Sequence, residues 1–257
     1  MTVEPVVSPR NPRIVAAARL HRARDRHSAG RTIIEGPHVL AEAIAGEVPV
    51  HEVFALETDR ETAQLVATTT ALAGATITIV GEAALARVSG TEHPRGPVAV
   101  IEVPAPVPPR RDVILLAVND PGNAGTLIRS AAAFGFDVAS IRGAVDLWAP
   151  KVLRSAAGGH FRTAIVTAEA VASHQTIVTV AAGGRPVADV GVMIDLEQPV
   201  VVVVGNEAHG VSGAVRRSAD AAVSIPMVAG IESLNAAVAG SIALYEIASA
   251  RGRRSDA

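Results

Sequence analysis

Val200-Val-Val-Val-Val-Gly205-Asn-Glu207 is the most informative stretch of this chain of 257 residues. Its five consecutive valines are typical of a strand that is buried on both faces, as in a parallel sheet. The strand ends in glycine and polar residues, and the carboxyl edge of an open α/β sheet is where such folds bind ligands. We therefore expect an α/β fold with a binding site directly after this strand.

The segment that follows completes the expected edge. A second strand over residues 221–225 leads through a turn to a final helix, whose first turn holds Ser233 and Asn235. Backbone N–H groups in a first helical turn have no partner within the helix and can bind a ligand. One face of this helix is apolar and carries Leu234, Val238, Ile242 and Tyr245. We expect that face to pack on the sheet.

The chain divides at a proline-rich segment, Pro104-Ala-Pro-Val-Pro-Pro-Arg-Arg111. Four prolines within six residues predict an extended, semi-rigid linker. Before it, short predicted helices, including one over residues 11–26 and one over residues 61–73, alternate with strands and indicate a small α/β domain with a sheet of about four strands. We predict a first domain of residues 1–103, a linker of residues 104–111 and a second domain of residues 112–257.

Composition excludes several classes of protein. Hydrophobic residues make up 49% of the chain, which is ample for a core, and there is no cysteine for a disulfide or a thiolate metal site. The eight histidines are scattered without metal-ligand spacing, so no metal is expected. An apolar run of about 18 residues and a signal-peptide pattern are both missing. We expect a soluble, cytoplasmic protein that does not enter a membrane.

Charge is unevenly distributed along the chain. The net charge of −2 argues against a strongly basic nucleic-acid binder, yet residues 1–31 carry seven arginines against Glu4 and Asp25. Two interpretations stay open, a solvated helix face and a surface that contacts phosphates.

Three polar clusters follow the ends of predicted buried strands in the second domain. They are Asn119, Asp120, Asn123 and Arg129, then Asn206 and Glu207, then Ser233 and Asn235. Each cluster alone could be an ordinary turn or helix cap, and Asp120 before Pro121 suits an N-cap and a first helical position. Their shared position at strand ends is what indicates a common site. Dinucleotide-binding, P-loop, zinc-protease and serine-hydrolase motifs are absent.

Together these clusters resemble the three ordered motifs of the SpoU (TrmH-like) RNA ribose methyltransferases of the SPOUT superfamily. The matching segments are Asn119-Asp-Pro-Gly-Asn-Ala-Gly-Thr-Leu-Ile-Arg129, Gly205-Asn-Glu-Ala-His-Gly210 and Ile225-Pro-Met-Val-Ala-Gly-Ile-Glu-Ser-Leu-Asn235. Upstream, Arg10-Asn-Pro-Arg13, Leu20-His-Arg22 and Ile34-Glu-Gly-Pro-His-Val-Leu40 are similar to the substrate-binding domain that often precedes the catalytic one. The resemblance thus covers nearly the whole chain.

The resemblance implies a fold and a function. The second domain would be a parallel sheet with a trefoil knot, preceded by a small α/β domain of the ribosomal-protein type that binds RNA. The cofactor would be S-adenosylmethionine, bound in the knot, and the enzyme a homodimer with its active site at the subunit interface. The two-domain layout favours ribosomal RNA as the substrate of 2′-O-ribose methylation. Alternatives are a transfer-RNA ribose methyltransferase, a noncatalytic RNA-binding protein that keeps the knot, and a methyltransferase for a protein or small molecule.

The resemblance also implies roles for individual residues. The cofactor pocket would be lined by Gly205, Ile225, Met227 and Leu234. The polar catalytic set would be Asn123, Arg129, Glu207, Ser233 and Asn235. The family's base role falls on Arg129, but an arginine keeps its proton in proteins, so a neighbouring RNA phosphate is the other candidate acceptor. Glu207 would orient Arg129 or the substrate.

Overall fold

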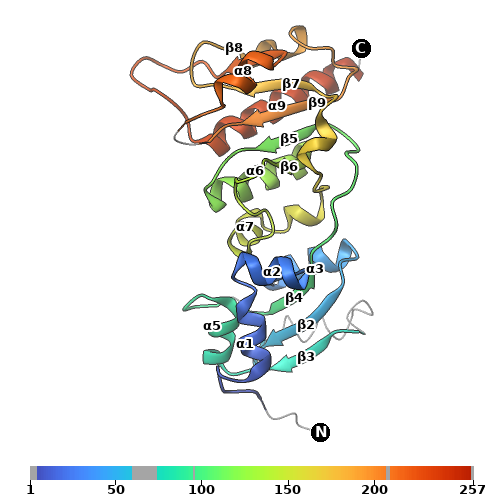
Figure 1. The fold of residues 1–257 in the computed structure, drawn as a ribbon, viewed down its shortest axis with the longest axis vertical. Coiled ribbons are helices and arrows are strands. Elements are labelled where there is room, and N and C mark those ends of the chain that lie inside the picture. The colour runs from blue at the N-terminus through green and yellow to red at the C-terminus, as the bar shows by residue number, and fades with distance from the viewer. Residues whose placement is uncertain (1–4, 60–73, 95, 207–208, 256–257) are drawn as a thin grey trace. The chain divides into compact units, whose positions relative to one another are not determined.

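The computed structural model describes residues 5–59, 74–94, 96–206 and 209–255 (Figure 1). The chain divides into two compact units, Met1–Pro104 with Trp148–Phe161, and Ala105–Leu147 with Arg162–Ala257. Glu207 and the helix expected over residues 61–73 lie outside the described residues. We call the two parts unit 1 and unit 2. The predicted domain boundaries, with a first domain of residues 1–103, a linker of residues 104–111 and a second domain of residues 112–257, stay a prediction.

Unit 1 is built on a four-stranded sheet in the order β1-β4-β2-β3. Its strands are β1 (Arg31–Glu35), β2 (Val50–Ala55), β3 (Thr76–Ile79) and β4 (Val98–Glu102). β4 runs antiparallel to both its neighbours, whereas β2 and β3 are parallel. A small α/β unit of this size is what the alternation of elements predicts.

The described α-helices of unit 1 are α1 (Pro12–Arg19), α2 (Ala23–Ala29), α3 (Pro37–Ala45), α5 (Glu82–Ser89) and α7 (Pro150–Ala156). Four of them, α1, α3, α5 and α7, contribute to two hydrophobic core clusters at the sheet. One core cluster joins Ile14 of α1 and Leu85 of α5 to Phe54 of the sheet. The other joins Leu40 of α3 and Leu153 of α7. The segment Trp148–Phe161, which contains α7, therefore belongs to the packing of this unit, and the hydroxyl of Thr32 donates to the carbonyl of Trp148 at 2.7 Å.

The prediction of one helix over residues 11–26 is wrong in one respect, because the structure has two helices there, α1 and α2. The Asn11 side chain caps α1 by accepting from the backbone N–H of Arg13 at 3.0 Å. After Leu20 the chain turns, and Nη1 of the buried Arg26 donates to the carbonyls of Leu20 and His21, both at 2.9 Å. This buried guanidinium satisfies carbonyls that a continuous helix would have used internally.

Unit 2 contains a six-stranded parallel sheet in the order β6-β5-β9-β7-β10-β8. Its strands are β5 (Val113–Leu116), β6 (Asp137–Ser140), β7 (Gln175–Thr179), β8 (Arg185–Pro186), β9 (Val200–Val204) and β10 (Ala221–Ser224). β9 lies between β5 and β7, and all five of its valines are buried, so the expectation of a parallel sheet around this strand is confirmed. Its helices are α6 (Pro121–Phe134), α8 (Gly213–Ser218) and α9 (Ala236–Ser255).

The final helix packs on the sheet as expected, but its predicted packing face is wrong for two of the four residues, since Leu234 and Ile242 are half-buried. Val238 and Tyr245 are exposed by 47% and 54%, and the buried positions are Ala237, Gly240, Ala243, Leu244, Ile247 and Ala250. At Gly240 an added Cβ would lie 2.5 Å from Leu127 of α6 and 2.9 Å from Val204 of β9. The small residues around Gly240 let α9 approach these neighbours closely, and Leu244 and Ile247 are buried on the same face.

The far end of α9 is tied to the start of the sheet. Arg251 donates from Nε to Asp112 Oδ2 at 2.7 Å and from Nη2 to Asp112 Oδ1 at 2.8 Å. The same carboxylate accepts the backbone N–H of Val200 at 2.9 Å. One ion pair therefore joins the last helix to the residues that begin β5 and β9. Among the described helices, none is long and apolar enough to span a membrane.

Candidate functional site

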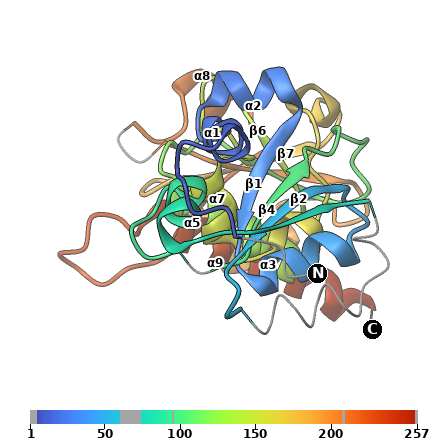
Figure 2. The same ribbon diagram turned by 90° about the horizontal axis from the view of Figure 1, so that it is seen from below.

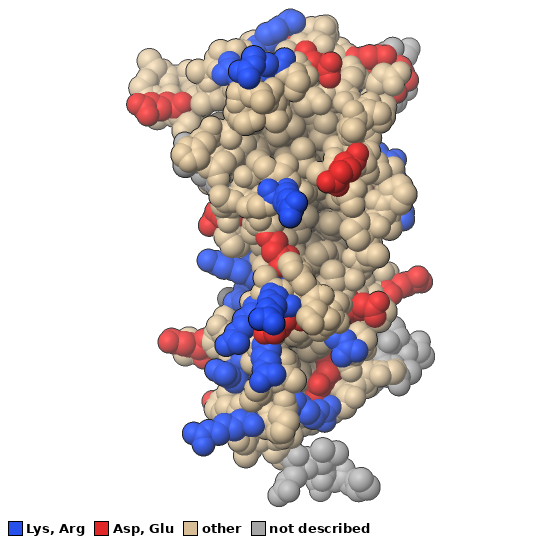
Figure 3. Space-filling model, in the orientation of Figure 1, with Lys and Arg blue, Asp and Glu red and all other residues tan. Residues whose placement is uncertain are grey.

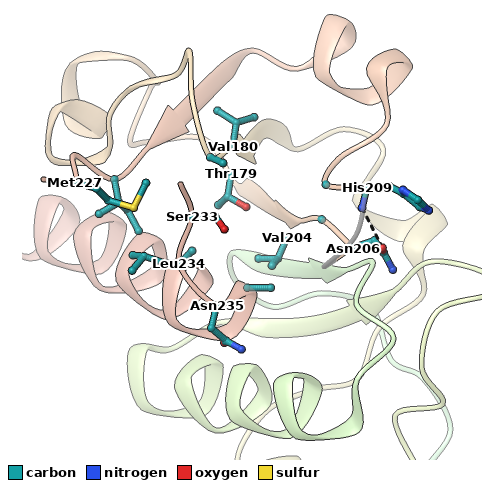
Figure 4. Close-up of a pocket in the computed structure, with 15 residues that line it drawn as sticks. Thr179, Val180, Val204, Asn206, His209, Met227, Ser233, Leu234 and Asn235 are labelled. Carbon is teal, nitrogen blue, oxygen red and sulfur yellow. Dashed lines mark hydrogen bonds between the residues drawn. The ribbon is translucent and has the colours of Figure 1, made fainter. Parts of the chain in front are cut away.

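A cavity of about 620 Å³ opens at the carboxyl ends of β7, β9 and β10 (Figure 4). This is the edge at which the sequence predicts a site, and the volume lies within the range of small-molecule pockets, about 300–1,000 Å³. The lining residues are Thr179, Val180, Ala181, Val204, Gly205, Asn206, His209, Gly210, Ile225, Met227, Ser233, Leu234, Asn235, Ala236 and Ala239. Apart from His209, none of them carries an ionisable side chain. The cavity thus suits a ligand held by backbone groups, apolar contacts and neutral polar side chains.

The loop after β9 forms one wall of this cavity. Asn206 and Gly210 exchange two backbone hydrogen bonds, at 3.0 and 2.8 Å, and Asn206 Oδ1 accepts the backbone N–H of His209 at 3.2 Å (Figure 4). Gly205 stands where the loop folds back on the strand. A Cβ on it would lie 2.4 Å from the Gly210 carbonyl carbon and 2.5 Å from the Val211 nitrogen. Only glycine fits there, which leaves the backbone as the surface that Gly205 presents.

The segment between β10 and α9 forms the opposite wall. Ile225, Met227, Ser233 and Leu234 all line the cavity, although β10 and α8 separate them in sequence from the loop after β9. Figure 4 shows Ser233 and Thr179 extending into the same space, from the segment before α9 and from the end of β7. The Thr179 hydroxyl donates to the carbonyl of Val203 at 3.2 Å, which fixes its orientation between the two strands.

Asn235 closes the cavity at the start of α9. Its Oδ1 accepts the backbone N–H groups of Ala237 at 2.9 Å and Val238 at 3.2 Å, so it is the N-cap of the helix. Its Nδ2 donates to Asn123 Oδ1 at 2.9 Å. Asn123 lies in the first turn of α6, where its backbone N–H donates to Asp120 at 2.8 Å. Asp120 is thus the N-cap of α6, as predicted, and Asn123 is connected to the cavity through Asn235.

Three residues of the predicted catalytic set, Asn123, Arg129 and Glu207, are not among those described as lining this cavity. Arg129 lies exposed on α6 and is absent from the described lining. Glu207 lies outside the described residues. Asn119 lines a second cavity, of about 310 Å³, which shares Asn206 and Gly210 with the first. The single chain therefore brings together the predicted cofactor residues, Ser233 and Asn235, and leaves Arg129 on an outer face.

Sequence reasoning missed the contribution of β7. Its end supplies Thr179, Val180 and Ala181 to the cavity. The available signal was the run of small residues that follows the strand, Ala181-Ala-Gly-Gly184. At Gly184 a Cβ would lie 2.7 Å from the carbonyl carbon of Val223, so this run lets the backbone pass close to β10.

No group of three or more histidine, aspartate or glutamate side chains that could hold a metal occurs in the part of the chain that the structure describes. The described lining of the first cavity offers backbone, amide, hydroxyl and imidazole groups beside apolar side chains, which suits an organic ligand.

Two family models match the chain. The SpoU rRNA Methylase family matches residues 110–245, which include all the residues that line the first cavity. The MRM3-like substrate binding domain matches residues 11–99.

Individual proteins of known name are similar to this chain over nearly its whole length. The 23S rRNA (guanosine(2553)-2'-O)-methyltransferase RlmP of Bacillus subtilis is 30% identical, over 94% of this chain and 98% of its own. The crystal structure of the SpoU methyltransferase AviRb of Streptomyces viridochromogenes, in complex with the cofactor AdoMet, superposes with a TM-score of 0.80 at 29% identity and covers 96% of this chain and 99% of that one. An AdoMet-bound rRNA methyltransferase of Sinorhizobium meliloti gives 0.79 at 25% identity, over 95% and 97% of the two chains. These similarities span both units.

Proposed function

This chain belongs to the SpoU rRNA methylase family, and we propose that it transfers a methyl group from S-adenosylmethionine to a ribose 2′-hydroxyl of ribosomal RNA. The observation that carries the proposal is the cavity at the carboxyl edge of the unit 2 sheet, which all four predicted cofactor residues line. Relatives that match over nearly the whole chain support the reaction and the RNA class, since one is named as a 23S rRNA 2′-O-methyltransferase and another was crystallised with AdoMet.

The cavity residues fit S-adenosylmethionine. Met227 and Leu234 offer apolar contact for the adenine ring and the methionine chain of the cofactor, and Gly205 presents backbone alone to the cavity. When bound, this cofactor supplies an electrophilic methyl group with a good leaving group, so no metal is required for the transfer.

The residues of the chain then have two tasks, to position the ribose hydroxyl and to let its proton leave. The hydrogen bond between Asn235 and Asn123 holds the start of α9 against the start of α6, which gives the cavity a fixed mouth. Ser233 supplies a hydroxyl at that mouth. Arg129 would hold an RNA phosphate beside the target ribose, and either this phosphate or Arg129 itself accepts the proton.

The exposed position of Arg129 supports a homodimer. α6 and α9 pack together, with Ser130 and Ser241 in hydrogen-bond contact at 2.7 Å and the rings of Phe134 and Tyr245 at 5.7 Å between centroids. Their outer faces carry Arg129 and the exposed apolar side chains of Val238 and Tyr245. A second copy that covers this surface would bury the apolar groups and bring its own Arg129 to the cavity.

The trefoil knot and the cytoplasmic location are parts of the same proposal. The knot is supported by the way Ile225, Met227 and residues 233–236 line one cavity with residues 204–206 and Gly210, although α8 and β10 separate the two segments in sequence. A ribosomal RNA substrate supports a cytoplasmic location.

Methyl transfer from radiolabelled S-adenosylmethionine to purified ribosomal RNA and transfer RNA tests the function. We expect label in ribosomal RNA, at a position that resists alkaline hydrolysis, and none with the Arg129→Ala variant. Label confined to transfer RNA would move the protein to the transfer-RNA alternative. RNA binding without any label would indicate the noncatalytic RNA-binding protein.

A further inference from the structure

The seven arginines of residues 1–31 fall into two groups, those that bond to other residues of the fold and those that are exposed without a bond to a described residue. Arg26 is buried and bonds two carbonyls, and Arg13 pairs with Glu52 at 2.7 Å. The other side chains of this region are exposed and form no hydrogen bond or ion pair with described residues; they are Arg10, Arg19, Arg22, Arg24 and Arg31. The fold therefore uses two arginines of this region and leaves a group of cations unneutralised.

The exposed arginines are held on rigid elements. Arg19 ends α1, Arg22 is the N-cap residue of α2, and Arg24 lies in its first turn. α1 is anchored in the core through Ile14 and Ala17. Anchoring the helices fixes the backbone positions from which these exposed arginines extend.

A further arginine joins them from α5, which lies beside α1 in both Figure 1 and Figure 2. The imidazole Nε2 of His21 lies 2.7 Å from the Val88 carbonyl, so the end of α1 is held against the end of α5. The last turn of α5 carries the exposed Arg87. Figure 3 shows Lys and Arg side chains gathered over the part of unit 1 where Figure 1 draws α1, α2 and α5. We call Arg19, Arg22, Arg24 and Arg87 the arginine face.

Stability does not explain the arginine face. Cations in the first turn of a helix oppose its dipole, and an arginine at the N-cap cannot accept a hydrogen bond from the helix. α2 has arginines at both places, and its N-cap makes no side-chain hydrogen bond. Asp25 is the single acidic residue of that first turn. The whole chain has a net charge of −2, so this local excess of cations does not reflect a generally basic protein.

We infer that the arginine face of unit 1 binds the phosphate backbone of the RNA substrate, without reading its bases. This inference rests on the proposed function for the identity of the polyanion and adds the surface that holds it. Arginine presents a planar fork of donors that matches a phosphate. The exposed arginines do not have to break a hydrogen bond or ion pair with a described residue to bind a phosphate. Because phosphates carry no sequence information, the arginine face positions the RNA, and the choice of nucleotide is made elsewhere.

A salt titration of RNA binding tests the inference. The probe is a fluorescently labelled hairpin transcript of ribosomal RNA, and the protein is the full chain with Arg19→Gln, Arg22→Gln and Arg24→Gln combined. If each arginine neutralises one phosphate, the slope of log K against log salt falls by about 2 for the triple variant. The control combines Arg110→Gln, Arg185→Gln and Arg217→Gln, which remove the same charge from exposed positions of unit 2, and it should leave the slope within error of the wild type.

Two further measurements make the result decisive. The triple Arg→Lys variant at positions 19, 22 and 24 should restore most of the slope, because it keeps the charge. A second hairpin with a different loop sequence should lose affinity by the same factor in the triple Gln variant. An unchanged slope, an equal fall in the control, or a loss limited to one hairpin would overturn the inference.

The same samples separate this inference from the proposed function. Calorimetry should give equal S-adenosylmethionine affinity for the wild type and the triple Gln variant, since the arginine face lies in unit 1 and the cavity in unit 2. A wild type that binds RNA through the arginine face but methylates none would disprove the function alone. If the wild type methylates RNA but the triple Gln variant has the same slope of log K against log salt as the wild type, the inference alone is disproved.

Discussion

Nδ2 of Asn235 donates a hydrogen bond of 2.9 Å to Oδ1 of Asn123, two residues separated by 112 positions in the chain. The same Asn235 side chain caps α9, and the backbone of Asn123 donates to the N-cap of α6. The first turns of two helices are thus locked to each other at the mouth of the cavity. A bond of this kind can serve stability, catalysis or both, and substitutions can separate the two.

Replacing Asn235 with alanine should lower both stability and turnover. Loss of the N-cap costs about 1 kcal/mol of unfolding free energy. Loss of the bond to Asn123 frees the mouth of the cavity, and a misplacement of this size can lower kcat roughly a hundredfold. Thermal unfolding and methyl-transfer kinetics measure the two effects. Asn235→Ser is the matched control, because serine caps a helix but is too short to reach Asn123. Wild-type turnover in the serine variant would show that the bond has no role in catalysis.

Gly205→Ala should weaken cofactor binding with little effect on the rest of the sheet. The new methyl group would meet backbone atoms at 2.4 and 2.5 Å, so the loop between Gly205 and Gly210 must move. We expect at least about a tenfold rise in the Kd for S-adenosylmethionine, or about 1.4 kcal/mol, by calorimetry. Gly213→Ala in α8 is the control, since its nearest neighbour is the flexible end of Arg217 at 3.3 Å. Equal affinities in the two variants would contradict this account of the loop.

The parts of this structure that could be predicted are those that depend on local chemistry. The five valines of β9 and the Asp120–Pro121 start of α6 are examples, because strand burial and capping follow from the residues themselves. The packing face of α9 was predicted wrongly. Hydrophobicity favoured Val238 and Tyr245, but the close approach of α6 and β9 selects the small side chains around Gly240. That selection depends on the neighbours, which a pattern within one helix does not contain.

In the candidate site, too, some positions could be predicted from the local sequence and others depend on neighbouring elements. Gly205 and Asn235 lie at ends of elements, where the motif alone indicates their position. The contribution of Thr179 could not be predicted without knowing that β7 lies next to β9. Strand order in a parallel sheet depends on long connections, and here the chain order of the strands differs from their spatial order.

Arg251→Ala should destabilise the protein without direct loss of cofactor binding. The guanidinium makes two hydrogen bonds to Asp112 and further bonds to the carbonyls of Leu196 and Gln198. Because the Arg251 side chain is 30% exposed, we expect a loss of about 2 kcal/mol in unfolding free energy, measured by chemical denaturation. Arg251→Lys keeps the charge but not the two-pronged contact and should fall between the wild type and the alanine variant. If the Arg251→Ala variant has the same unfolding free energy as the wild type, the ion pair between Arg251 and Asp112 contributes nothing to stability.

Stability should fall in mild acid because of His174. Burial lowers the pKa of this histidine, and the negative charge of Asp112 and a hydrogen bond with the backbone of Arg111 oppose the shift only in part. The unfolded chain then binds a proton more readily than the folded one, so stability is highest above the ordinary histidine pKa of about 6.5 and is lost as the pH falls below it. Unfolding free energies at neutral and mildly acidic pH measure the change. His174→Gln should flatten the decrease over this window, and an unaltered decrease would assign it to other groups.

Mixing the Arg129→Ala and Gly205→Ala variants tests whether Arg129 acts across a dimer, at an S-adenosylmethionine concentration far below the Kd of Gly205→Ala, where each variant alone is nearly inactive. Arg129→Ala keeps its own cavity, and Gly205→Ala keeps its Arg129, so a mixed dimer has one complete site if the arginine comes from the partner. Random exchange of subunits makes about half of the dimers mixed, and the activity should return to roughly a quarter of the wild type. If Arg129 served the cavity of its own chain, no dimer would contain a complete site and the mixture would stay inactive. Tyr245→Glu places a charge on the exposed face of α9 and should prevent this recovery while light scattering reports a monomer. A Tyr245→Glu pair that stays dimeric and still recovers activity would exclude the α6 and α9 surface as the interface.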